Sequence, residues 1–502
     1  MEIRYQEQKK LFRGYQSKKV FFTGLVLLIF SGFGLSQELI LMEKIRTFTK
    51  SELSSIFFIE ALYNVDVYRI HYTTTNTFAQ KDTASGVFCL PVKANTVFPI
   101  LIYDHGTVSD RYDVPSFGSY EQSISAVFAS FGFITVAPDY IGLGISKGLH
   151  PYVHPESEAR AGIDLVLAVK AINSLENFHY NDQLFITGYS QGGHAAMATF
   201  KTLSASSELE VTAVAPMSGP YSISREMKKF TFGDTEYFFC AYLGSVLLTA
   251  KYVYPELFTE LEIEDMLKPD YAVMVRKFER EEIDLDDLND QMIAKLRQNN
   301  GKVLPKRMFI DSVANAFLTD DDHPLNQALE RMDVCDWKPE KPLKMLYCKN
   351  DDQVTYRNAV YADSLMHANG SETVSAADVF SSGDHGTCFY PAALALRTFF
   401  WQYQEIGTVG TTEPENPSIS IWPNPASDLL YFENINMNVQ GKDIMIRLYD
   451  ATGQLLATHK ILPNAQAINN IDIHYLKSGL YIIEISNSNG LVEIKKLVKS
   501  PQ

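Results

Sequence analysis

The chain has 502 residues, a length at which two or three domains are expected rather than one. Hydrophobic residues make up 46% and charged residues 21%, which argues against a disordered chain and for a globular protein with a sizeable core. The net charge of −16, with no cluster of Lys and Arg in the body of the chain, argues against a nucleic-acid partner.

Residues 1–36 are predicted to be a secretory signal peptide. Small residues, Gly34 and Ser36, stand just before Gln37. An apolar stretch, Val20–Phe33, precedes them, and it follows a basic segment that holds Lys9, Lys10, Arg13, Lys18 and Lys19. The alternative is a membrane anchor, but the apolar stretch is shorter than the ~20 residues that a spanning helix needs. We therefore expect cleavage and export.

Residues 37–406 are predicted to form an α/β domain. Apolar residues at helical spacing predict a helical lead-in over 37–62, and alternating patterns predict strands over 67–72 and 86–90. Continuous apolar runs of the buried-strand type follow at Pro99–Tyr103, Phe133–Ala137, Leu184–Thr187, Val211–Ala215 and Leu343–Tyr347. Predicted helices separate several of them: Tyr120–Phe131, Glu156–Asn173 and the segment after Ser190. This alternation predicts a mostly parallel sheet.

The alternation stops over residues 220–337, which lack strand signals and are rich in helix formers and acidic residues. We interpret this segment as a helical cap inserted over the active site, with an apolar part too short to span a membrane. Residues 407–417 then have the Gly, Thr, Pro and Glu content of a linker. Beyond it, short alternating strands separated by turns predict a small β-sandwich over 418–502.

The pattern Gly188-Tyr189-Ser190-Gln191-Gly192 follows a predicted strand and precedes small residues suited to a closely packed helix. Such a strand–turn–helix setting is the one in which G-x-S-x-G exposes a nucleophilic serine above the sheet of an α/β-hydrolase. We predict that Ser190 is the nucleophile. The alternative is a structural serine in a glycine-rich turn.

The base and the acid of a triad should follow in the order Ser, Asp, His. His385, among small residues after the last predicted strand, is the predicted base. Two neighbouring aspartates, Asp351 and Asp352, follow the strand after the cap and compete for the role of acid. We favour Asp351, because Val354 stands three positions after it, as in many hydrolases of this fold. Asp384 is adjacent to His385 and therefore poorly placed to orient it.

The oxyanion hole is predicted to use the backbone N–H groups of Gln191 and of Thr107, which lies in the loop after the strand at residues 99–103. The same loops hold cysteines: Cys348 precedes Asp351 by three residues, and Cys388 follows His385 by three. A disulfide would tie the acid loop to the base loop if the two α-carbons lie within about 7 Å. The alternative is two separate buried thiols. None of the five cysteines stands in a C-x-x-C pair, so the sequence gives no indication of a metal site.

Residues 60–402 resemble secreted α/β-hydrolases of the lipase and esterase type, close to the secretory-lipase-like branch. Besides the triad segments, Pro138-Asp139-Tyr140-Ile141-Gly142-Leu143-Gly144 and His150-Pro151-Tyr152 carry this resemblance. It implies hydrolysis of small-molecule or lipid carboxylic esters through an acyl-enzyme, without a metal or organic cofactor. Two other functions stay open: a serine peptidase of the same fold, and a non-catalytic surface binding protein on a hydrolase scaffold.

The last 85 or so residues resemble the C-terminal sorting domain of the type IX secretion system of Bacteroidota. The matching segments are Trp422-Pro423-Asn424-Pro425-Ala426, Leu448-Tyr449-Asp450, Gly479-Leu480-Tyr481 and Lys495-Lys496-Leu497-Val498-Lys499. This resemblance implies the secretion machinery as a partner, and a protein exported across both membranes to the medium or the cell surface. The alternative is a carbohydrate-binding or adhesive β-module.

Overall fold

The computed structural model describes residues 38–57, 59–172, 175, 178–409, 419–433, 444–461, 470–487 and 490–500. The predicted signal peptide and most of the predicted linker lie outside these residues. Within them, no helix is both long enough and apolar enough to cross a membrane.

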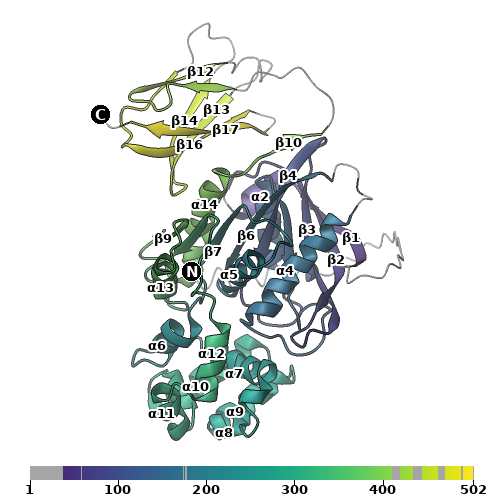
Figure 1. Ribbon diagram of the computed structural model, residues 1–502, viewed down its shortest axis with the longest axis vertical. Helices are drawn as coiled ribbons and strands as arrows, with labels where there is room; N and C mark the ends of the chain where they lie inside the picture. Colours follow the sequence, from purple (N-terminus) through teal and green to yellow (C-terminus); the bar gives the residue numbers. More distant parts are fainter. Residues whose placement is uncertain are drawn as a thin grey trace. The chain divides into compact units, whose positions relative to one another are not determined.

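One large sheet forms the centre of the first domain, in the order β1-β2-β3-β5-β4-β6-β7-β8-β9 (Figure 1). Pairing is antiparallel from β1 to β5 and parallel from β5 to β9. The strands are β1 (Leu39–Phe48), β2 (Val65–Thr75), β3 (Lys81–Pro91), β4 (Thr96–Asp104), β5 (Ile134–Pro138), β6 (Tyr180–Tyr189), β7 (Ala213–Met217), β8 (Leu343–Tyr347) and β9 (Val374–Asp378). The expected mostly parallel sheet is confirmed.

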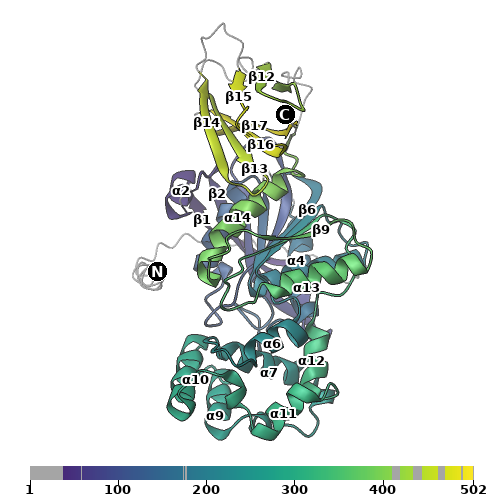
Figure 2. The same cartoon turned by 90° about the vertical axis from the view of Figure 1, so that its left-hand side faces the viewer.

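Helices cover both faces of this sheet, which explains why its parallel strands are continuous apolar runs. One buried cluster joins the sheet to α4 (Pro155–Lys170), α5 (Gln191–Ser204) and α13 (Arg357–Ala368). The cluster on the opposite face joins it to α2 (Lys50–Phe57), α3 (Tyr120–Ser130) and α14 (His385–Trp401). Figure 2 shows α14 running along the sheet, and Asp384 caps this helix by accepting from the Thr387 N–H.

Two predictions near the ends of this domain were partly wrong. The lead-in is helical only in α2, because residues 39–48 form β1, which pairs with β2 along its length. Leu39, Leu41 and Ile45 fit a strand as well as a helix, and the long-range pairing decides between them. The linker was expected to start at Gly407, but Gly407–Thr408 forms β10, which pairs with β4.

The segment between β7 and β8 is helical, as expected of a cap (Figure 1, teal to green). Its helices bury a core of their own, in which Leu288, Met292 and Val275 are fully buried. The elements are η2 (Ile223–Met227), α6 (Lys228–Thr231), α7 (Ala241–Val253), η3 (Pro255–Leu257), α8 (Ile263–Met266), α9 (Pro269–Glu279), α10 (Leu285–Asn300), η4 (Pro305–Met308), α11 (Asp311–Thr319) and α12 (Pro324–Met332).

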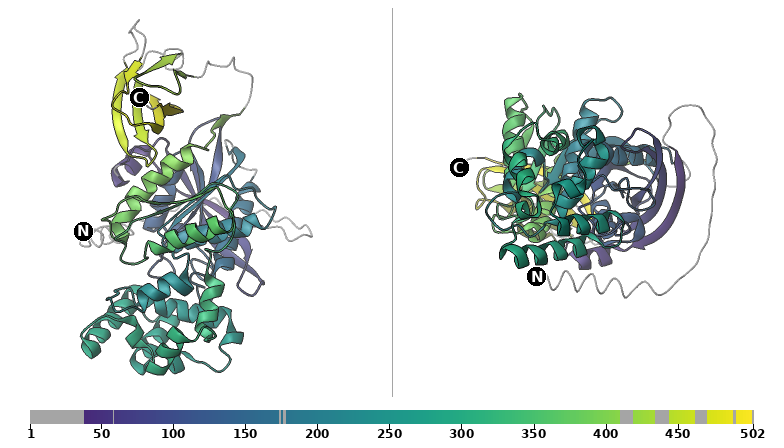
Figure 3. Two further views of the ribbon diagram at one scale, coloured as in Figure 1. Left: turned by 60° about the vertical axis from the view of Figure 1, so that its left-hand side comes forward. Right: turned by 90° about the horizontal axis from the view of Figure 1, so that it is seen from below.

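The C-terminal module consists of two antiparallel sheets around one apolar core (Figure 3, yellow). The first sheet has the order β11-β12-β15 and the second β14-β13-β16-β17. The strands are β11 (Ser420–Trp422), β12 (Leu429–Glu433), β13 (Ile444–Asp450), β14 (Leu455–Ile461), β15 (Asn470–Asp472), β16 (Gly479–Asn487) and β17 (Gly490–Lys499). Buried Leu430 of one sheet and Ile446 and Ile483 of the other belong to this core, as expected for a small sandwich.

Candidate active site

Ser190 stands at the sharp turn between β6 and α5, with φ of 60° and ψ of −120°. A non-glycine residue at positive φ is strained. The backbone N–H of Ser190 donates a 3.0 Å hydrogen bond to the Met217 carbonyl, which holds the residue in this conformation. The turn is also crowded. A β-carbon at Gly188 would overlap the backbone of Gly192, and one at Gly192 would overlap the Asp104 carbonyl. Glycine is therefore required on both sides of the serine.

His385 and Asp351 form a buried pair. His385 Nδ1 lies 2.7 Å from Asp351 Oδ2, and the side chains are 7% and 1% exposed. The other carboxylate oxygen of Asp351 accepts from the backbone N–H groups of Gln353 at 3.0 Å and Val354 at 2.8 Å. The backbone thus fixes the carboxylate, and the carboxylate fixes the imidazole. This leaves His385 Nε2 as the ring nitrogen that can take a proton.

His385, the predicted base, lies against the residue that precedes the serine. The rings of Tyr189 and His385 are 4.9 Å apart between centroids, and the Tyr189 hydroxyl donates to the His385 carbonyl oxygen. The structure therefore brings the base loop and the serine turn together, across almost two hundred residues of sequence. The sequence shows no signal for this contact, because Tyr189 occupies a variable position of the G-x-S-x-G pattern.

A disulfide joins Cys348 to Cys388, with 5.9 Å between the α-carbons. This separation meets the condition set by disulfide geometry. Both cysteines are fully buried, and the bridge links the end of β8 to the first turn of α14. Among the described residues, Cys89, Cys240 and Cys335 are buried free thiols.

The loop after β4 meets the serine turn at Gly106. A β-carbon there would lie 3.3 Å from the Tyr189 carbonyl oxygen and 3.9 Å from the Ser190 β-carbon. Thr107 follows directly, and its hydroxyl is 2.9 Å from the Tyr152 hydroxyl. On the other side of Ser190, Gln191 begins α5. The loop that holds Thr107 and the turn that holds Gln191 therefore flank one small region beside the serine.

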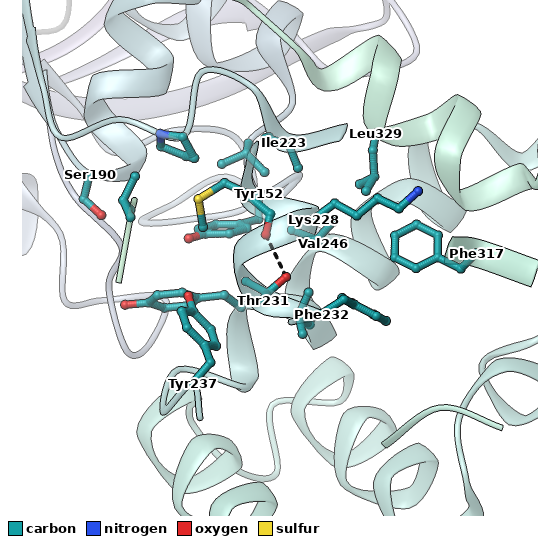
Figure 4. Close-up of a pocket in the computed structure, with 16 residues that line it drawn as sticks. Tyr152, Ser190, Ile223, Lys228, Thr231, Phe232, Tyr237, Val246, Phe317 and Leu329 are labelled. Carbon is teal, nitrogen blue, oxygen red and sulfur yellow. Dashed lines mark hydrogen bonds between the residues drawn. The ribbon is translucent and has the colours of Figure 1, made fainter. Parts of the chain in front are cut away.

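A cavity extends from Ser190 into the cap (Figure 4). Its empty space, including the opening, is about 620 Å³. None of its lining residues is acidic, and Lys228 is the one charged residue among them. They are Tyr152, Val153, Ser190, Pro220, Ile223, Met227, Lys228, Thr231, Phe232, Tyr237, Tyr242, Leu243, Val246, Phe317, Leu329 and Val354. The Lys228 ammonium donates to Asn326 at 2.8 Å and lies over the Phe317 ring.

The cap is anchored to the acid loop through Gln353, a contact that the sequence does not signal. The Tyr237 hydroxyl donates to the Gln353 carbonyl at 3.1 Å, and the Tyr242 hydroxyl donates to its side-chain oxygen at 2.9 Å. The same loop carries Asp351. Two aromatic residues that line the cavity are thus hydrogen-bonded to Gln353, which stands two positions after the candidate acid.

Comparisons with known proteins agree with both halves of this architecture. Residues 420–500 match the family model of the secretion system C-terminal sorting domain. The first domain is similar in fold to a protein of Legionella pneumophila, with 24% identity, a TM-score of 0.65 and coverage of 73% of this chain and 98% of that one. No curated protein sequence gives a significant match to the chain.

Two further solved structures are similar. The rice cell wall degrading esterase LipA from Xanthomonas oryzae has 24% identity and a TM-score of 0.63, over 72% of this chain and 96% of that one. Candida antarctica lipase A in its closed state has 16% identity and a TM-score of 0.54, over 73% and 81%. The first domain has the α/β-hydrolase fold. The C-terminal module is a secretion sorting domain, which indicates export to the surface or the medium.

Proposed function

We propose that the protein is a secreted serine hydrolase that cleaves carboxylic esters through an acyl-enzyme on Ser190. The observation that carries this proposal is the buried Asp351–His385 pair beside the strained serine turn, with 2.7 Å between carboxylate and imidazole. A nucleophile, a base and a group that orients the base are the parts that acyl transfer requires. The similar folds of an esterase and a lipase support ester chemistry.

In the proposed reaction, His385 Nε2 accepts the proton of Ser190 as the serine oxygen attacks the ester carbonyl. Asp351 holds the Nδ1–H of the ring and stabilises the imidazolium that forms. The backbone N–H groups of Gln191 and Thr107 stabilise the negative oxygen of the tetrahedral intermediate. His385 then protonates the departing alcohol, and a water molecule that it activates releases the acid from Ser190. No step uses a metal or an organic cofactor.

The cavity in the cap is proposed to hold the acyl chain. Its walls are almost entirely aromatic and aliphatic, and Ser190 lies at one end of it. Burying an acyl chain there contributes about 0.8 kcal/mol per methylene group. We therefore propose that esters with an apolar acyl chain are better substrates than acetates.

A serine peptidase of the same fold is the alternative, and it would need carboxylates to bind the N-terminal amine of a peptide. The sequence of the cap is rich in acidic residues, but the lining of the cavity contains no Asp or Glu among the described residues. The single cation there, Lys228, would repel an amine. These features favour the esterase.

A substrate panel tests the proposal. The exported protein is incubated with p-nitrophenyl esters from acetate to long-chain acyl groups and with aminoacyl anilides. We expect ester turnover that rises with chain length and little anilide hydrolysis. Preferential anilide hydrolysis would instead identify a peptidase. If the protein turned over neither class of substrate and a fluorophosphonate did not label Ser190, it would be a binding protein on a hydrolase scaffold.

The sorting domain supports a proposal about the route of export. We propose a signal peptide over residues 1–36, a hydrolase domain over 37–406 and a linker after it, which begins beyond Thr408 because β10 includes that residue. The type IX machinery would then recognise residues 418–502. Signal-peptide cleavage is checked by sequencing the N-terminus of the exported protein, which we expect to begin at Gln37.

A further inference from the structure

A glutamate is buried beside the serine turn, and the triad does not use it. Glu158 lies in the first turn of α4 and is 1% exposed. A buried carboxylate is costly unless hydrogen bonds compensate it. Glu158 has three such partners, from different parts of the chain. They are the backbone N–H of Val153 at 3.2 Å, the side-chain amide of Gln191 at 2.9 Å and the His194 ring at 2.7 Å.

Among these partners, Gln191 is the residue whose backbone N–H is a proposed oxyanion donor. Its amide nitrogen lies 2.9 Å from Glu158 Oε1 and 2.8 Å from His150 Nε2. His150 Nδ1 lies 2.8 Å from the Ile141 carbonyl, which can only accept, so that Nδ1 donates and Nε2 accepts. Both neighbours of the Gln191 amide are thus acceptors. Each of its two N–H bonds has a partner, which fixes the side chain.

Another partner, Val153, connects Glu158 with Thr107, the other proposed donor. Val153 has φ of 51°, which is rare for a β-branched residue, and its N–H donates to the same Glu158 oxygen. Tyr152, the residue before it, reaches the Thr107 hydroxyl at 2.9 Å. A strained residue keeps its conformation only when its surroundings hold it. Glu158 is part of what holds the segment that contacts Thr107.

The third partner, His194, links this group to the cap. His194 is fully buried, and its Nε2 lies 2.8 Å from the carbonyl of Met332 at the end of α12. Burial lowers the pKa of His194, but the charge of Glu158 and its hydrogen bond outweigh that effect and raise the pKa. Burial, and after it the charge of Glu158, raises the pKa of Asp104, the nearby buried carboxyl group. Both ring nitrogens of His194 therefore face acceptors, Glu158 Oε2 at 2.7 Å and the Met332 carbonyl.

We propose that Glu158 is a positioning residue that sets both oxyanion donors, Gln191 directly and Thr107 through the Val153–Tyr152 segment. The inference rests on the proposed function. It predicts that removing the Glu158 acceptors weakens stabilisation of the tetrahedral intermediate more than binding of the substrate, because Glu158 itself does not line the acyl cavity and Tyr152 and Val153 form only a small part of its wall.

The test compares Glu158→Met with Glu158→Gln. Methionine removes the acceptors, whereas glutamine keeps one oxygen for Val153 and Gln191 and offers an N–H to His194. We expect E158M to lower kcat by about 10- to 100-fold, with KM within about threefold of wild type. A boronic acid that forms a tetrahedral anion on the serine should lose affinity by the same factor. E158Q should keep most of the wild-type kcat and most of the affinity for the boronic acid.

Gln191→Met serves as a second variant that breaks only the amide contacts and leaves the Glu158–His194 pair in place. It should lower kcat and boronic acid affinity together by about tenfold. The matched control is Thr199→Val on the same helix, since Thr199 is fully buried and its hydroxyl has no hydrogen-bond partner among the described residues. T199V should keep wild-type kinetics.

The outcomes separate the two proposals. An active wild type whose E158M or Q191M variant folds and keeps normal kcat and boronic acid affinity overturns the inference alone. So does a loss that falls entirely on KM, which would indicate substrate binding rather than positioning. A folded wild type that neither turns over esters nor binds the boronic acid contradicts the proposed function itself.

Discussion

The side chain of Asp352 accepts a hydrogen bond from the backbone N–H of His385 at 3.1 Å. It thereby holds the first residue of α14 in place, while the neighbouring Asp351 holds the imidazole of the same residue. The two adjacent aspartates therefore contact different parts of one histidine. This division of contacts leads to different expectations for the two positions.

We expect Asp351→Asn to lower kcat by about 10⁴-fold, as is typical when a triad aspartate is replaced in this way. The asparagine oxygen would keep the two backbone N–H bonds, so that the amide nitrogen would face His385 Nδ1 and favour the wrong tautomer. Asp352→Asn should stay within about tenfold of wild type, because an amide oxygen can still accept from the His385 N–H. Steady-state kinetics on a p-nitrophenyl ester measure both. A larger loss in D352N would reverse the assignment of the acid.

Ser190→Ala is expected to lower ester turnover by about 10⁶-fold in a folded protein, and His385→Ala by nearly as much, because the members of a catalytic triad act as a unit. Circular dichroism and thermal unfolding provide the check on folding. Combining both substitutions should cost little more than either alone. If either single variant retained more than about a tenth of the activity, the assignment of the nucleophile and the base would be wrong.

The cap cavity is expected to set the preference for acyl-chain length. Val246→Trp adds bulk to its wall and should lower kcat/KM for long-chain esters by about tenfold or more, while acetate turnover stays nearly constant. The matched control is Val273→Trp on α9, where the side chain is 56% exposed and outside the cavity. An equal loss on short and long esters in V246W would show that the acyl chain binds elsewhere.

The sequence predicted those parts of the fold that depend on local patterns. Strands such as Leu343–Tyr347 are recognisable because burial on both faces requires continuous apolar side chains. The serine turn is recognisable because only glycine fits at Gly188 and Gly192. Both signals lie within a few residues of the feature that they predict, and a single sequence is enough to read them.

The features that were missed depend on contacts between distant segments. Residues 39–48 became a strand because β2 was available for pairing, which no local pattern encodes. Glu158 looks like an ordinary acidic residue in the first turn of a helix, and its burial against Gln191 and His194 emerges only from the packing of α4 on α5. The sequence likewise left the pairing of Cys348 with Cys388 open.

Export is expected to depend on the sorting domain and not on catalysis. A chain that ends at residue 415 lacks the segment that matches the sorting-domain family and should be retained in the cell envelope. The full-length S190A variant is the control, and it should be exported like the wild type. Immunoblots of medium, surface and periplasmic fractions of a host with type IX machinery distinguish the two. Normal export of the shortened chain would contradict the assignment.

The Cys348–Cys388 bridge is expected to support both stability and turnover. It closes a segment with a sequence separation of 40 that contains Asp351 and His385, so that its loss should lower the free energy of unfolding by about 2–4 kcal/mol. Replacing both cysteines by serine should also lower kcat, because the acid and base loops would move independently. Since both sulfurs are buried, a reductant should act only after partial unfolding.

Denaturant unfolding and ester kinetics of the C348S/C388S variant test this expectation, and mass mapping of non-reduced peptides tests the bridge itself. Cys335→Ser is the control for loss of a buried sulfur that forms no bridge. It should reproduce only the cost of replacing a buried sulfur by a hydroxyl, without a change in kcat. If the double variant matched this control in stability and in turnover, the bridge would have no role in holding the acid and the base together.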